Sequence, residues 1–93
     1  MKKHFLKYVQ HAYDWDELNC TSTAKERVQA MTRFLKDPNL GMQNLKFKIS
    51  KVNKMRKGVY QVTVHGSRNA LLSIVTQWGF GMRYKLNGKR KVT

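Results

Sequence analysis

The sequence predicts an α+β fold, a ferredoxin-like β-α-β-β-α-β sandwich in which an antiparallel sheet carries two helices on one face. Two segments place apolar residues at helical spacing, three segments alternate apolar with polar residues, and these segments follow one another in a compatible order. We expect one basic α+β domain over residues 1–93 with short mobile basic ends, because 41% hydrophobic residues in 93 suffice for one modest core.

A capping box marks the start of the first helix. Thr23 and Glu26 have the spacing at which each side chain bonds the other residue's backbone, and apolar residues follow at helical spacing. A second helix is expected after Ser67, a favourable N-terminal cap, and Gly79 or Gly81 would end it. The apolar stripe of this second helix consists of Leu71, Ile74, Val75 and Trp78.

Three further segments have the pattern of strands that are half-buried in a sheet. Residues 45–49 and 82–86 alternate, and residues 59–65 are rich in β-branched side chains. The polar residues 53–58 between the first two strands predict a hairpin connector. Asn87-Gly88 is a strong hairpin signal, so the chain beyond it either folds back as a short edge strand or remains a tail.

Residues 4–13 admit two readings, and the choice between them decides the architecture. As a helix, these residues gather several apolar side chains on one face, which gives the order α-α-β-β-α-β; as a strand, they supply a fourth strand. Periodicity favours the helix, and aromatic content favours the strand. We prefer the strand, because it gives both amphipathic helices a common sheet face on which to pack.

Charge is divided unevenly along the chain. It carries 19 Lys and Arg against 5 Asp and Glu, a formal net charge of +14, and all five acids lie within the first 37 residues. Residues 38–93 therefore hold only cations, which indicates a polyanionic partner. We expect that partner to be nucleic acid, either DNA or RNA. The hydrophobic fraction excludes a disordered basic tail, and Cys20, the single cysteine, excludes an internal disulfide.

Because side chains alternate along a strand, many of these cations are expected on one face of the predicted sheet. If the apolar strand positions point to the helices, the intervening side chains reach the opposite surface. We expect contacts to nucleic acid on that face, in the connector, and at the start of the second helix, where free N–H groups attract anions. These residues are Lys46, Lys48, His65, Arg83 and Lys85 on the face, Lys51, Lys54, Arg56 and Lys57 in the connector as a flexible basic finger, and Ser67 and Arg68 at the helix start. Alternatively, the strand lysines are solvated and only prevent edge pairing, and Ser67 is an ordinary cap.

Residues 57–64 resemble a motif of RNA-recognition domains. These domains share the β-α-β-β-α-β order, and their third-strand motif opens with Lys-Gly, as Lys57-Gly58 does here. The resemblance implies that bases stack on outward aromatic side chains, whereas the outward positions here are Val59, Gln61 and Thr63. We therefore expect phosphate contacts in place of base stacking, with weak sequence specificity and strong salt dependence.

An acidic segment raises the question of catalysis. Asp14, Asp16 and Glu17 follow His11, and paired carboxylates hold Mg²⁺ in enzymes that hydrolyse phosphodiesters. An Asp at the end of the first strand in this fold order is also similar to the arrangement in Cas2-type proteins, and a metal-dependent nuclease is one alternative. An acidic loop that offsets the basic domain is the commoner explanation, so we expect no enzyme activity, no metal and no cofactor.

An acidic protein is the alternative partner. Compact basic proteins of this size are similar to accessory proteins of bacterial viruses, and the same face would suit the binding and modulation of an acidic host protein. No apolar run has the length of a signal peptide or a membrane span. We therefore expect a cytoplasmic protein without a membrane partner.

Overall fold

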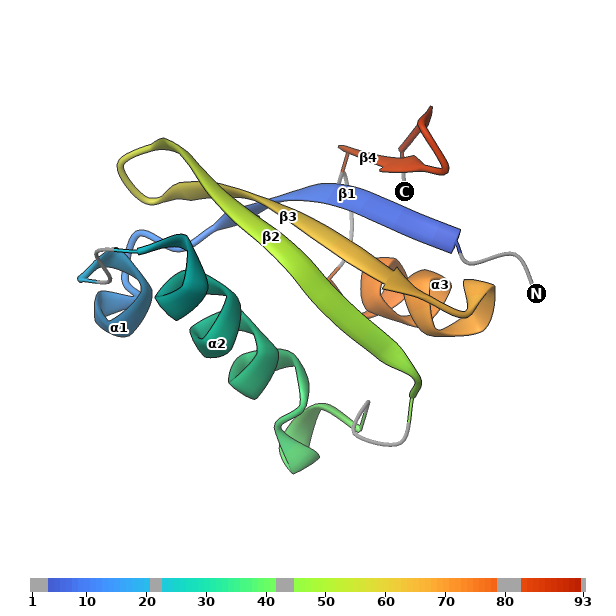
Figure 1. Ribbon diagram of the computed structural model, residues 1–93. Helices are drawn as coiled ribbons and strands as arrows, with labels where there is room; N and C mark the ends of the chain where they lie inside the picture. Colours follow the sequence, from blue (N-terminus) through green and yellow to red (C-terminus); the bar gives the residue numbers. More distant parts are fainter. Residues whose placement is uncertain (1–3, 21–22, 42–44, 79–82, 93) are drawn as a thin grey trace.

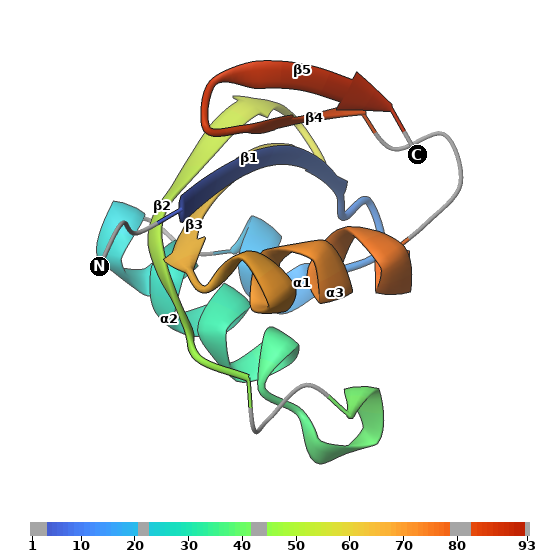
Figure 2. The ribbon, with the colours of Figure 1, turned by 90° about the vertical axis from the view of Figure 1, so that its right-hand side faces the viewer.

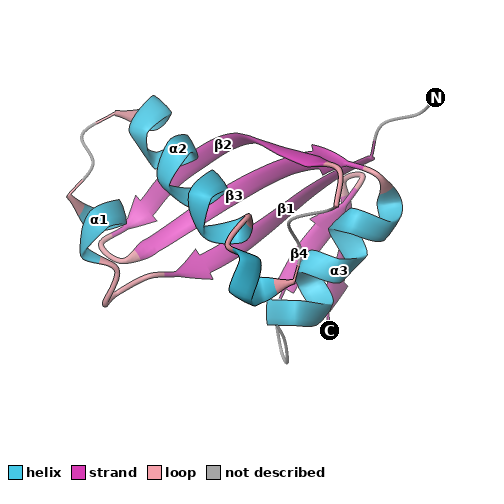
Figure 3. Ribbon diagram, turned by 90° about the horizontal axis from the view of Figure 1, so that it is seen from below, coloured by secondary structure: helices cyan, strands magenta, loops and turns pink. Residues whose placement is uncertain are grey.

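The computed structural model describes residues 4–20, 23–41, 45–78 and 83–92. In chain order its elements are β1 (His4–His11), α1 (Asp16–Asn19), α2 (Ala24–Leu35), the short 3₁₀ helix η1 (Pro38–Leu40), β2 (Phe47–Arg56), β3 (Val59–Gly66), α3 (Arg68–Trp78), β4 (Arg83–Leu86) and β5 (Lys89–Val92). The strands form one antiparallel sheet in the order β2-β3-β1-β4-β5. The α-helices lie below this sheet in Figures 1 and 2 and in front of it in Figure 3. The prediction of an α+β fold with an antiparallel sheet is confirmed.

β1 is a strand in the interior of the sheet, so the helical reading of residues 4–13 is wrong. It pairs with β3 along its whole length and with β4 through its middle. Leu6 and Tyr8 turn toward the helices and are 0% and 1% exposed, whereas Phe5 and Val9 alternate onto the other side of the sheet. Because apolar residues occur on both faces of this strand, its sequence lacks a clean alternation.

The core lies between the sheet and the helices. Its fully buried members include Leu18 of α1, Met31 and Leu35 of α2, Leu71 and Ile74 of α3, and Val52, Val62 and Val64 of the strands. The hydroxyl of Tyr8 reaches into this core, where it lies 4.0 Å from the sulfur of Met31. Burial raises the pKa of the Tyr8 hydroxyl above its ordinary value, because the charged form would lose its hydration.

Local caps begin both long helices as predicted. The Thr23 hydroxyl accepts from the backbone N–H of Glu26, and the Glu26 carboxylate accepts from the N–H of Thr23, each at 3.1 Å. Ser67 Oγ accepts from the N–H of Ala70 at 3.2 Å, and α3 follows. Of the predicted apolar stripe, Leu71, Ile74 and Val75 are buried, while the side chain of Trp78 and the glycines at 79 and 81 lie outside the described residues. No helix among the described residues is long and apolar enough to cross a membrane.

β2 and β3 form the expected hairpin, but its connector is shorter than predicted. β2 continues to Arg56, and only Lys57 and Gly58 remain in the turn, with Gly58 at φ +77°. Two register shifts, around Ser50 and around Met55, let β2 stay paired with β3 up to the turn. The basic finger predicted as a flexible loop is therefore mostly a hydrogen-bonded strand.

The basic residues after β4 form a strand and not a mobile end. β5 pairs with β4 across a turn in which Asn87 has φ 53° and Gly88 has φ 84°, as Asn-Gly hairpins require. Asn87 also holds β1, because its N–H donates to the Phe5 carbonyl at 2.9 Å and its side-chain oxygen accepts from the Phe5 N–H at 3.0 Å. The fold-back alternative is confirmed for this end, and residues 1–3 lie outside the described residues.

Candidate nucleic-acid interface

The two sides of the sheet differ in charge. We call the side that faces away from the α-helices the open face. The five strands, as the structure describes them, contain no Asp or Glu. The acidic residues are Asp14 after β1, Asp16 and Glu17 in α1, Glu26 in α2 and Asp37 before η1. Nothing acidic on the strands therefore offsets the cations of the open face.

One row of residues on the open face crosses four strands. Thr63 of β3 lies opposite Lys51 of β2 on one side and Lys7 of β1 on the other, and Lys7 lies opposite Lys85 of β4. Neighbouring strands lie about 4.8 Å apart, so these four residues span about 14 Å. We call them the lysine row. Its three lysines are exposed, whereas Thr63 is only 6% exposed between them.

The lysine row is an electrostatically unfavourable arrangement in the free protein. Residues directly opposite one another in an antiparallel pair have their Cβ atoms about 5 Å apart, and like charges in that position destabilise the sheet. Among the described residues no ion pair involves the lysine row. An anion bound over the row would relieve this repulsion, which makes the row a favourable place for phosphates.

A second row lies beside the first and contains Lys48, His65 and Phe5. His65 of β3 lies opposite Lys48 of β2 and opposite Phe5 of β1. The rings of Phe5 and His65 have their centroids 6.1 Å apart and are tilted by 38°. Lys48 is exposed, and the two rings are partly exposed. The predicted residues Lys48 and His65 are thus brought together with an aromatic side chain that was not predicted as part of the site.

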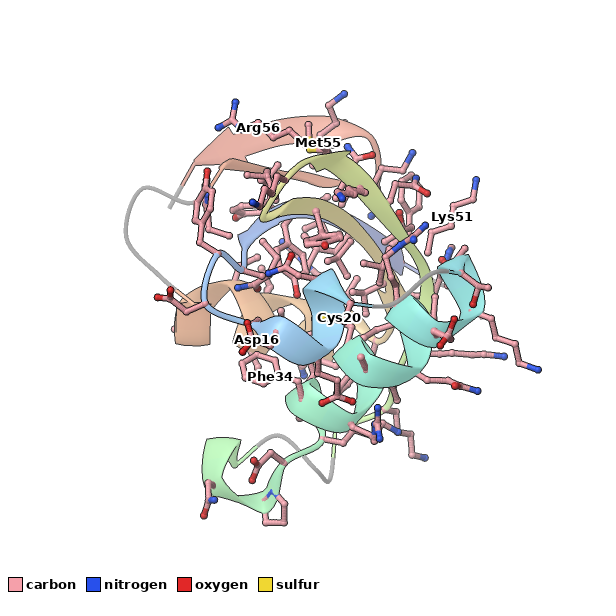
Figure 4. The ribbon with its side chains drawn as sticks, turned by 90° about the vertical axis from the view of Figure 1, so that its left-hand side faces the viewer. Asp16, Cys20, Phe34, Lys51, Met55 and Arg56 are labelled. Carbon is pink, nitrogen blue, oxygen red and sulfur yellow. The ribbon has the colours of Figure 1, made fainter. Side chains whose placement is uncertain are left out.

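The hairpin tip divides its cations between the two sides of the sheet. Arg56 lies opposite Val59, which places it on the open face, and Figure 4 shows it at the tip of the hairpin. Lys54 lies opposite the buried Tyr60, which places it on the helical side. Lys57 is exposed in the turn itself. The predicted connector residues therefore do not act as one finger.

Lys46 and the start of α3 meet at one end of the sheet. The N–H of Ser67 donates to the carbonyl of Lys46 at 3.3 Å, and a Cβ atom on Gly66 would come within 2.5 Å of that same oxygen. Arg68 is exposed as the first residue of α3. Because the Ser67 hydroxyl caps Ala70, its ordinary capping role accounts for that side chain.

Three cations of the helical layer have contacts within the protein. Arg27 Nε donates to the carbonyl of Val52 on the edge strand β2 at 2.9 Å. Arg33 forms an ion pair with Glu17 of α1. Lys36 lies over the ring of Phe47, with its ammonium nitrogen 5.4 Å from the ring centroid. These contacts give Arg27, Arg33 and Lys36 a structural role, in contrast to the lysine row.

The acidic segment does not bring three potential metal ligands together among the described residues. His11 and Asp14 border a hollow on the surface, which is further lined by Gln10, Ala12, Tyr13, Trp15 and Phe34. Glu17 instead pairs with Arg33, and Figure 4 shows Asp16 on α1 in the helical layer. No three His, Cys, Asp or Glu side chains in the described part of the chain come together as ligands for a metal ion.

Sequence reasoning missed Lys7 and Phe5, and it included one residue that is only partly described. Both missed residues belong to β1, whose outward positions follow only from its pairing with β3. Arg83 is the first residue of β4, but its side chain lies outside the described part of the structure. No family model, curated protein or solved structure matches this chain. What the protein does is therefore inferred from its fold and its charged surface.

Proposed function

We propose that this protein binds nucleic acid through the phosphate backbone, with the open face of its sheet as the contact surface. The lysine row carries the proposal, because three exposed ammonium groups follow one another across the sheet without an acid on any described strand. Lysines that neutralise phosphates release counterions, which favours binding. Backbone contacts position a protein without reading bases, so sequence specificity is weak.

The contact surface extends from the lysine row toward both ends of β2. Lys48 and His65 lie in the neighbouring row, and Arg56 lies at the hairpin tip. Lys46 and Arg68 are exposed at the opposite end, beside the start of α3. If about four to six of these groups meet phosphates, the slope of log K against log salt for duplex DNA is roughly −4 to −5.

We also propose that the fold is of the ferredoxin-like type. The strand order β2-β3-β1-β4 supports this assignment, together with α2 between β1 and β2 and α3 between β3 and β4. α1, η1 and β5 are then additions to the basic β-α-β-β-α-β pattern. Helices that cover one side of a sheet leave its other side available to a ligand.

A comparison of two double variants tests the proposed surface. Lys7→Gln with Lys85→Gln removes two charges from the lysine row, and Lys25→Gln with Lys36→Gln removes two exposed charges from the helical layer. Binding of duplex DNA, single-stranded DNA and RNA is measured over a range of salt concentrations. We expect the first variant to bind more weakly and to lower the salt slope by roughly two, one for each lost phosphate contact, while the second changes little.

Each outcome has a distinct meaning. Equal losses in the two variants would mean that only net charge matters and that the open face is not the site. A larger loss in the helical variant would move binding to the other side of the sheet. If the unmodified protein retains no nucleic acid at moderate salt, the proposal is wrong and an acidic protein partner takes its place.

A further inference from the structure

Phe5 is an aromatic side chain on a surface of cations and polar groups. The other described aromatic residues of the strands, Tyr8, Phe47, Tyr60 and Tyr84, belong to the core or pack against it. Phe5 lies on the open face and is partly exposed. Burial of an aromatic side chain stabilises a protein, so this partly exposed position forgoes part of that gain in the free protein. A ligand that covers the ring would recover it.

Cations flank the Phe5 ring on its own strand and across the sheet. Lys7 follows two residues later on the same side of β1, about 6.6 Å along the strand. His65 lies directly opposite Phe5, and Lys48 lies opposite His65. A flat group placed over the ring would therefore have the imidazole of His65 beside it, with Lys7 farther along β1 and Lys48 beyond His65 across the sheet.

The backbone of Phe5 is fixed from both sides. Toward β3 it lies in the ladder opposite His65. Toward β4, Asn87 bonds both its N–H and its carbonyl, at 3.0 and 2.9 Å. The backbone that carries the ring thus has satisfied hydrogen bonds in the interior of the sheet, and a ligand does not have to order this backbone.

We propose that Phe5 and His65 form a stacking platform for one unpaired base of a single-stranded nucleic acid, with Lys7 and Lys48 as partners of the flanking phosphates. This inference rests on the proposed function and specifies the kind of nucleic acid. Every base has a π face, so stacking adds affinity without sequence readout. In a duplex the bases are stacked on one another, and the platform has no base to bind. The outward positions of β3 alone do not predict base stacking, because the aromatic side chain of this platform, Phe5, belongs to β1.

The experiment compares three ligands of equal length: an oligothymidine, the same strand made of abasic nucleotides, and a duplex. The unmodified protein should bind the oligothymidine roughly 5- to 150-fold more tightly than the abasic strand, the range expected for one stacked base. Phe5→Leu should lose this difference and keep the salt slope, because it removes no charge. Phe5→Trp should retain the difference, because it restores an aromatic face.

The controls separate this inference from the proposed function. Equal affinity of the unmodified protein for the oligothymidine and the abasic strand would overturn the platform without any variant. The platform would also be overturned if Phe5→Leu kept the full difference in affinity between these two strands. Loss of that difference in Phe5→Trp would have the same meaning. In these cases salt-dependent binding of all three ligands would still support backbone recognition. If the unmodified protein bound none of the three ligands, the proposed function itself would be overturned.

Discussion

Replacement of Lys85 by glutamine is expected to stabilise the fold while it weakens nucleic-acid binding. Lys85 lies directly opposite Lys7, and no ion pair among the described residues offsets either charge. Two unit charges at an assumed separation of about 7 Å in water repel each other by about 0.6 kcal/mol. A gain of this size raises the melting temperature of a domain of this length by about 2–5 °C.

Salt provides the decisive test of that stabilisation. The Debye length is about 10 Å at 0.1 M salt and about 3 Å at 1 M, so the gain should be clear at low salt and nearly absent at 1 M. Thermal unfolding of Lys7→Gln, Lys85→Gln and the double variant should show that Lys7→Gln adds little once Lys85 is replaced. Lys85→Gln should still add some stability after Lys7→Gln, because position 85 also lies opposite Arg90 of β5. Lys48→Gln is the matched control, since it removes one charge from the same face at a position opposite His65.

Three results would refute the reasoning. A gain that persists at 1 M salt would not be electrostatic. A gain equal to that of Lys48→Gln would reflect net charge and not the pair. Stabilisation without weaker binding would mean that the lysine row does not contact the nucleic acid.

Two further predictions concern the fold. Tyr8 has a raised pKa, so above pH 10, the ordinary value, the unfolded chain releases the Tyr8 proton while the folded protein keeps it, and stability falls as pH rises. The free energy of unfolding of the unmodified protein relative to Tyr8→Phe should drop by about 1 kcal/mol between pH 10 and 11, and a constant difference would contradict this. Gly58→Ala should cost about 1–2 kcal/mol, because Gly58 has φ +77°. A Cβ atom there would also lie 2.4 Å from Tyr13 Cδ1, so full recovery in a Tyr13→Ala background would assign the cost to that clash instead.

The helices could be predicted from the sequence because their signals are local. The capping box at Thr23 and the cap at Ser67 act within one turn of backbone, and the structure has both. The side of β1 that faces outward depends on partners far along the chain. Lys7 and Phe5 join the open face only through pairing with Thr63 and His65. Their place in the candidate site could not be read from β1 alone.

The position of Lys51 was mispredicted because β2 contains a register shift. The buried residues Phe47 and Ile49 are two apart, and the next one, Val52, is three further on. An additional residue at Ser50 keeps Val52 in the core and turns Lys51 onto the open face. The change of spacing from two to three is visible in the sequence, but the run of polar residues after Val52 is also typical of a loop.

The position of β1 between β3 and β4 has a consequence for the order of events during synthesis. β1 is synthesised before either of its partner strands. Leu6 can therefore pair with Val64 and Leu86 only after most of the described chain has been synthesised. Contacts between residues so distant in sequence form slowly, because a long loop must close first. The lysine row and the Phe5 position need β1, β3 and β4 together, so a nascent chain lacks them until synthesis has passed β4. The ability to bind should therefore appear late and all at once, together with the completed sheet.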